Sequence, residues 1–293
     1  RAMTTKAGSR RRWCPPRRGS AREGSDMNPM ARRMFELVEP IGAIPYSADE
    51  PNEAMFALGF TDFWDTYFAG RAAPLGVVPA EVVDALFYNF APGEVARHIP
   101  DVWRTTTPEA ALAARQRGCV KALRRILDGH VDDPAVIRAA ELLHKAAISA
   151  PVEGRPMYAA LRSVPASDEV LGRLFHAASL LREHRGDGHI AALVTERVGG
   201  LEAHVLLALD MGMPAESFGR LHHLRPSHLA SVIDGVRDRG LIGDDGAHAG
   251  GHERDDPTGD GADTGRAGID GERDGQSGRR CCRRGVGATD EGG

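Results

Sequence analysis

The strongest constraint on the fold is a series of apolar stripes at helical spacing, each bounded by capping residues, proline or glycine. The Thr-Pro-Glu segment at 107–109 supplies an N-cap, a first-turn proline and an acidic residue ahead of a long stripe that ends near Asp128. An Asp-Pro pair at 133–134 repeats this start signal for a helix that Pro151 ends. No alternating strand pattern appears before residue 240. We therefore predict a mainly α fold, a helical bundle with at most a small hairpin.

Three further segments favour the same class. Apolar residues from Met34 to Ile41 predict a first helix, which Pro40 should kink or end. Pro79 opens another helix, which closes at 92–93. Between these two helices lie aromatic side chains that are too numerous for a solvated loop, so we expect them to form core or to line a pocket. They are Phe56, Phe60, Phe63, Trp64, Tyr67 and Phe68.

The two ends of the chain differ from its middle. Residues 1–30 carry eight Lys or Arg and almost no apolar residue, and residues 247–293 are rich in Gly, Asp and Arg. Neither end can bury enough apolar surface to offset the entropy of folding, so we predict a disordered basic arm and a disordered tail. Both ends also resemble out-of-frame translation of GC-rich DNA, with Met27 or Met30 as the true start and a frameshift near Gly246. Resequencing the gene tests this hypothesis.

Charge and cysteine usage exclude several classes of protein. The arms carry net charges of +6 and −3, which leaves −7 for residues 31–246 and argues against broad nucleic-acid affinity. The basic arm is interpreted either as a random extension or as a nucleic-acid or membrane arm. The cysteines form neither a disulfide framework nor a zinc spacing, and they are Cys14, Cys119, Cys281 and Cys282. Because no apolar run approaches a membrane span or a signal peptide, we expect a cytoplasmic protein with no membrane partner and no cofactor.

Two similar segments suggest an internal duplication within the helical domain at 31–212. Each segment has a Gly-Arg step followed by a proline and a helix, and the two repeats would lie near 53–128 and 151–212. Duplicated halves often place a ligand site at their joint, so Arg71 and Arg155 become candidates for clamping an anion. The alternative is that each arginine caps a helix C-terminus or pairs with a local carboxylate.

The densest polar motif is REHRGDGH at 182–189. It follows a helix that starts near Ser167, and its two glycines predict a tight turn before a new helix at Ile190. Its candidate ligand-binding residues are Arg182, Glu183, His184, Arg185, Asp187 and His189.

Three interpretations of this motif stay open. The first is a metal site, for which the weak candidates are His176, His184, Asp187 and His189, with Glu183 as a further ligand. The second is a general acid or base, either His184 or His189, held by Asp187. The third is a charged turn, in which Asp187 caps the following helix and the arginines pair with nearby acids.

The segment 213–246 has the pattern of a helix-turn-helix. A short helix from Glu216, a turn and a second helix at 227–238 precede an Arg-Gly-Leu-Ile step toward a hairpin, as in a winged helix. The core face of this pair would comprise Leu224, Leu229, Val232, Ile233 and Val236. The candidate DNA-binding residues are Arg225, Ser227, His228, Ser231, Arg237 and Arg239. Asp234 and Asp238 oppose them, and the wing would follow Gly246, where the sequence degenerates.

Five blocks together are similar to the actinobacterial SalK-like proteins: AGRAAPLG at 69–76, the segment 87–103, EGRPMYAA at 153–160, LLREHRGDGH at 180–189 and RDRGLI at 237–242. The resemblance covers about residues 31–246 and implies a C-terminal winged helix-turn-helix. The chain departs from the family pattern after Gly246.

Taken with the motifs, this resemblance predicts a ligand-responsive transcriptional regulator, with DNA and an unknown small molecule as partners and a homodimer as its assembly. The alternatives are a metal- or small-molecule-binding protein or enzyme that uses REHRGDGH, and a scaffold for protein interactions.

Overall fold

The computed structural model describes residues 28–217 and 224–243, and over these residues the protein is mainly α-helical. The predicted tail at 247–293, the wing and most of the predicted basic arm lie outside the described residues. The first helix begins at Pro29, inside the predicted arm, where Asn28 caps it by accepting a hydrogen bond from the backbone N–H of Met30.

The α-helices run in chain order as follows: α1 Pro29–Gly42, α2 Ile44–Ser47, α3 Asp49–Phe56, α4 Phe63–Ala72, α5 Ala80–Phe87, α6 Pro108–Leu127, α7 Pro134–Ser149, α8 Pro156–Arg162, α9 Val170–Thr195, α10 Gly200–Asp210 and α11 Pro226–Asp238. Short 3-10 turns join them: η1 Ala73–Leu75, η2 Val95–Arg97, η3 Asp101–Arg104, η4 Asp128–His130 and η5 Ala215–Ser217.

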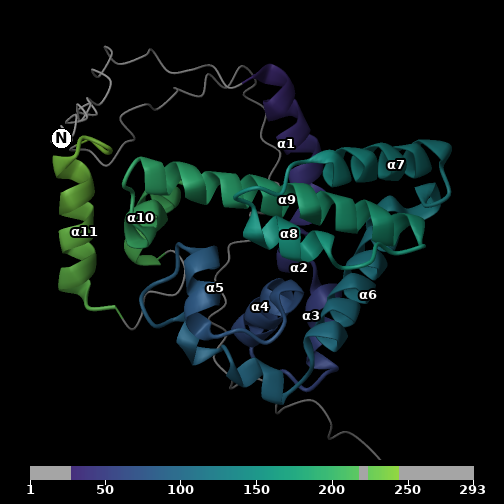
Figure 1. Ribbon diagram of the computed structural model, residues 1–293, viewed down its shortest axis with the longest axis horizontal. Helices are drawn as coiled ribbons and strands as arrows, with labels where there is room; N and C mark the ends of the chain where they lie inside the picture. The colour runs from purple at the N-terminus through teal and green to yellow at the C-terminus, as the bar shows by residue number, and fades with distance from the viewer. Residues whose placement is uncertain (1–27, 218–223, 244–293) are drawn as a thin grey trace, which may run out of the picture.

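Helix α9 is the central element of the bundle (Figure 1). It packs against α1, α6, α7 and α8, while α3 and α4 pack against α6. Helices α10 and α11 lie at the end of the bundle away from α7 (Figure 1). The chain therefore runs along α9 from the centre of the bundle to the C-terminal helices α10 and α11.

The predicted caps of α6 and α7 are confirmed. The side chain of Thr107 accepts from the backbone N–H of Ala110, and that of Asp133 accepts from the N–H of Ala135. The prediction that Pro40 could end the first helix is wrong, because α1 continues through Pro40 to Gly42. The packing of α1 on α9 offsets the one backbone hydrogen bond that a proline removes.

The aromatic segment forms core, as predicted for most of its members. Phe68 is fully buried and stacks on Phe87 with ring centroids 5.9 Å apart, and Trp64 and Phe90 pack around this pair. Phe56 is an exception, because it lies at the end of α3 with its side chain exposed. The rings fix α4 against α5 and so set the position of the polar residues that α4 carries.

Candidate functional site

The REHRGDGH motif lies inside one continuous helix. Helix α9 runs without interruption from Val170 to Thr195, so the predicted tight turn at Gly186 and Gly188 is wrong. Each glycine costs a helix about 1 kcal/mol relative to alanine, and burial of α9 on four neighbouring helices outweighs this cost. Gly188 has a packing role, because a Cβ there would lie 2.9 Å from the guanidinium of Arg155.

The centre of the bundle holds a buried ion pair between Arg71, in the last turn of α4, and Glu183 of α9. The two nitrogen–oxygen distances are 3.4 and 3.2 Å, and the side chains are only 14% and 8% exposed. Arg71 also donates to the hydroxyl of Tyr67 at 3.1 Å and lies 4.2 Å from the centre of the Phe87 ring. Burial raises the pKa of Glu183, but the opposing effect of Arg71 and its neighbours is larger, so the net shift is downward.

Three further arginines lie around this pair. Arg182 donates to Glu39 of α1 at 3.0 Å and lies over the ring of Tyr46, and the exposed Arg185 also reaches Glu39, at 3.2 Å. Arg115 of α6 is buried and donates to the hydroxyl of Tyr46 and to the carbonyl of Gly70. We call Arg71, Arg115, Arg182, Glu183 and Glu39 the central cluster.

The central cluster carries an excess of positive charge, because three guanidinium groups face two carboxylates. A cavity of about 20 Å³ lies beside it, lined in part by Tyr46, Thr66, Tyr67 and Arg115. This volume holds roughly one water molecule. Sequence reasoning missed Arg115, although a signal exists: this arginine interrupts the buried stripe of small residues that α6 presents at Ala111, Ala114 and Gly118.

A second group of motif residues surrounds the start of α8. Asp187 accepts hydrogen bonds from the backbone N–H groups of Met157, at 3.3 Å, and Tyr158, at 2.9 Å. It therefore caps α8, whereas the charged-turn interpretation had it capping a helix after the motif. The pKa of Asp187 is raised because burial outweighs these two bonds. His184 packs edge-on against Tyr158 with centroids 5.0 Å apart.

The two arginines of the predicted anion clamp contact different parts of α9. Arg71 is engaged by Glu183, and Arg155 lies against Gly188 more than one helical turn further along α9. The duplication that suggested this clamp stays a prediction.

The histidines of the motif do not gather around a metal position. Among the described residues, only Asp62, Asp65 and His98 bring three ligand atoms within 4.8 Å of one another, so His176, His184, Asp187 and His189 form no such group. Burial lowers the pKa of His184, and the positive charge of Arg155 lowers it further. Burial and the charge of Arg185 lower the pKa of His189 in the same way. Burial and His144 hold the pKa of His176 at about 4.

Helix α11 has the predicted amphipathic form. Leu229 is buried against Val205 and Ala208 of α10, with Leu224, Val232 and Ile233 packed around them, and Val236 is also fully buried. The opposite face of α11 exposes Ser227, His228, Ser231, Asp234 and Asp238. Residues 218–223, which would complete the short first helix from Glu216, lie outside the described residues.

Two of the candidate DNA-binding arginines are engaged within the protein. Arg237 pairs with Asp234 at 2.8 Å. Arg239 pairs with Glu202 at 2.8 Å and donates to the backbone carbonyls of Glu196 and Arg197, so it ties the end of α11 to the start of α10. Arg225 precedes α11 and is exposed.

Comparison with known families found a match over most of the chain. The model of a helix-turn-helix family matches residues 31–274. Comparisons with curated proteins and with solved structures found no match. Among the described residues, no helix combines the length and apolar character needed to cross a membrane.

Proposed function

Because the chain belongs to this helix-turn-helix family, we propose that it is a DNA-binding transcriptional regulator that acts in the cytoplasm. The observation that carries the proposal is the amphipathic α11, whose apolar face packs on α10 while its polar face is open. In helix-turn-helix proteins the second helix enters the major groove with such a face. A C-terminal wing and a homodimer complete the proposal, since paired half-sites compensate for few contacts per chain.

The polar face of α11 supplies the proposed DNA contacts. Ser227, His228 and Ser231 present hydroxyl and imidazole groups that reach base edges, and Arg225 supplies a charge for a phosphate. Since Arg237 is paired with Asp234, the proposal does not depend on it. The net charge of −7 over residues 31–246 leads us to expect weak non-specific affinity, so discrimination between sequences should exceed that of a basic protein.

The central cluster is the proposed site for a small anionic effector. Its excess positive charge favours a carboxylate or a similar anion, and Arg115 offers a planar pair of donors. An effector larger than water requires Tyr46 to move, together with the four-residue helix α2 that carries it.

Helix α9 connects this proposed effector site with the DNA-binding pair. It bears Arg182 and Glu183, and the two residues that follow it, Glu196 and Arg197, accept hydrogen bonds from Arg239 at the end of α11. A displacement of α9 would therefore reach α11 through a rigid element.

The first test selects bound duplexes from a random-sequence library with the full chain, then measures fluorescence anisotropy with the enriched and scrambled duplexes over a salt series. We expect one sequence class to be enriched. Arg225→Ala should weaken binding to all duplexes and reduce the salt slope by about 1, whereas Ser231→Ala should reduce discrimination at one position. Lys145→Ala, an exposed site on α7, is the matched control, because α7 lies on the opposite side of the bundle from α11 (Figure 1). A selection that enriches no sequence would overturn the regulator proposal.

The second test adds small organic carboxylates to the protein–DNA complex. We expect at least one to change the DNA affinity of the wild type and to lose this effect in Arg115→Met. Equal responses of wild type and variant, or no response to any carboxylate, would contradict the proposed effector site and leave DNA binding untouched.

A further inference from the structure

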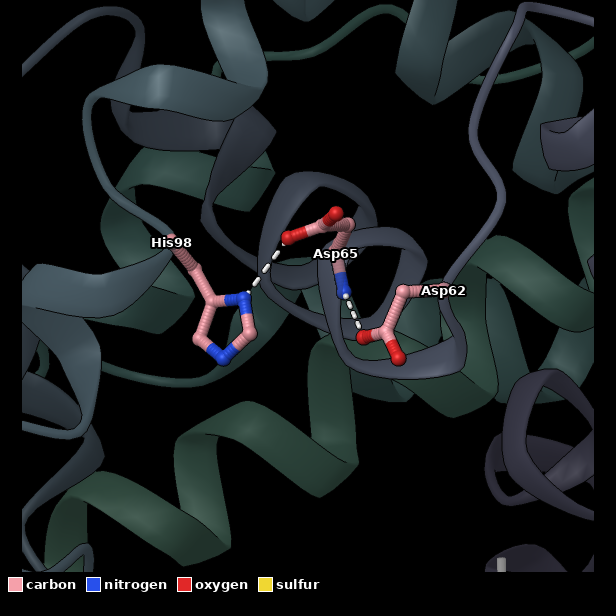
Figure 2. Close-up of side chains that lie close together, drawn as sticks. All are labelled: Asp62, Asp65 and His98. Atoms are coloured by element: carbon pink, nitrogen blue, oxygen red, sulfur yellow. Dashed lines mark hydrogen bonds and ion pairs between the residues drawn. The ribbon is translucent and has the colours of Figure 1, made fainter. Parts of the chain in front are cut away.

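A second polar group lies at the opposite end of α4 from Arg71. Asp62 is the N-cap of α4, Asp65 lies in its first turn, and His98 follows η2 (Figure 2). Their ligand atoms lie within 4.8 Å of one another, and they are the one group of this kind among residues 28–217 and 224–243. The family match and the motifs of the sequence leave this group without a role.

The imidazole of His98 lies between two carboxylates. Its Nδ1 is 2.7 Å from Oδ1 of Asp65, and its Nε2 is 3.5 Å from Oε1 of Glu94, which is fully buried. The ring is itself buried and stacks on Phe68 with centroids 4.6 Å apart, so it is held in this orientation.

Two carboxylates lie on the Nδ1 side of the ring. The ligand atoms of Asp62, Asp65 and His98 lie within 4.8 Å of one another, and Nδ1 faces Asp65 directly. Glu94, on the Nε2 side, is also paired with Arg97 at 3.6 Å. A divalent cation bound to Nδ1 would therefore be attracted by the carboxylates of Asp62 and Asp65.

We propose that Asp62, Asp65 and His98 bind a divalent transition-metal ion of the zinc class. Metal-binding histidines almost always donate their other N–H to a carboxylate, a backbone carbonyl or water, and a Glu94 oxygen lies 3.5 Å from Nε2, from where it would move closer to accept this bond. One imidazole nitrogen and two carboxylate oxygens suit zinc and cobalt, and water completes the coordination from the exposed side of Asp62.

The geometry needs only a small adjustment to accept the ion. With bonds of about 2.0–2.2 Å in a tetrahedral arrangement, neighbouring ligand atoms lie roughly 3.3 Å apart, so Nδ1 and Oδ1 of Asp65 must separate slightly. Asp62 caps α4 through Oδ1, and its other oxygen points away from His98 in Figure 2, so this carboxylate must turn to give an oxygen to the metal. The positive end of α4 opposes a cation by about half a charge, and two carboxylates more than offset it.

The ion would join the start of α4 to the segment after η2.

The test uses the full chain after dialysis against a chelator. Cobalt(II) is titrated while its visible absorption is recorded. We expect one Co²⁺ per chain, displaced by Zn²⁺. Asp62→Asn and Asp65→Asn should each weaken Co²⁺ binding about tenfold or more. Asparagine is itself a good N-cap, so Asp62→Asn should leave the fold intact.

Asp133→Asn is the matched control, because Asp133 also caps a helix and has one histidine, His130, at 3.9 Å. Its Co²⁺ affinity should equal that of the wild type. Absence of stoichiometric Co²⁺ binding would overturn the proposal. Binding that is unchanged in both Asp62→Asn and Asp65→Asn would also overturn it and point to other ligands, such as Cys281 and Cys282 of the tail.

Discussion

Replacing Glu183 by glutamine should destabilise the protein by about 3 kcal/mol. The substitution keeps the side-chain volume and one acceptor oxygen but removes the negative charge that faces Arg71 at 3.2 and 3.4 Å. Arg71 has a side chain only 14% exposed, so water cannot replace the lost carboxylate. Removing one partner of a buried ion pair costs about 3–5 kcal/mol, and the retained oxygen places the expected loss at the lower end.

Urea unfolding at neutral pH, followed by circular dichroism, measures this loss provided that the dependence on denaturant is unchanged. Glu53→Gln is the matched control, because Glu53 pairs with Lys121 at 2.9 Å with both side chains more than 60% exposed. Its effect should be far smaller, since water screens exposed pairs.

A double variant separates the ion pair from the shape of the site. Arg71→Met with Glu183→Leu should recover most of the stability lost in Glu183→Gln, because apolar groups often replace a buried ion pair without cost. The double-mutant cycle then gives the coupling between the two residues. A loss in Glu183→Gln no larger than that in Glu53→Gln would refute the reasoning.

Three further predictions concern local structure and pH. Gly186→Ala should stabilise the protein by about 1 kcal/mol, because alanine favours a helix over glycine by this amount. The added Cβ would meet only the Glu183 carboxylate, at 3.9 Å. A lower melting temperature of the variant would contradict a continuous α9. Because burial holds the pKa of His176 at about 4, below its usual 6.5, the unfolded chain takes up the proton first. The contribution of His176 to the free energy of unfolding should therefore be full above pH 6.5 and fall toward pH 4. In His176→Gln the urea midpoint should depend less on pH over this range. The same pH dependence in variant and wild type would contradict this prediction. Arg239→Ala should lower the protection of backbone amides from hydrogen exchange in α11 but not in α7, because it removes the contacts to Glu202 and to two backbone carbonyls. The same protection of α11 in variant and wild type would show that these contacts do not hold α11.

The sequence by itself determined the local elements. The caps at Thr107 and Asp133 and the apolar face of α11 follow from residues within one or two helical turns, and the structure confirms them. Such signals are local because a cap satisfies the first backbone groups of its own helix and a stripe reports which face is buried. The sequence also identified Arg71, Arg182 and Glu183 as residues of interest.

Only the tertiary structure decided which partners these residues have. Glu183 pairs with Arg71, which lies 112 residues earlier in the sequence. Asp187 caps α8, whose first residues lie about 30 residues earlier. The sequence pattern missed His98, whose partner Asp65 lies 33 positions earlier. Periodicity shows that a face is buried but not what covers it, so burial of α9 among four helices overrode the local preference of Gly186 and Gly188 for a turn.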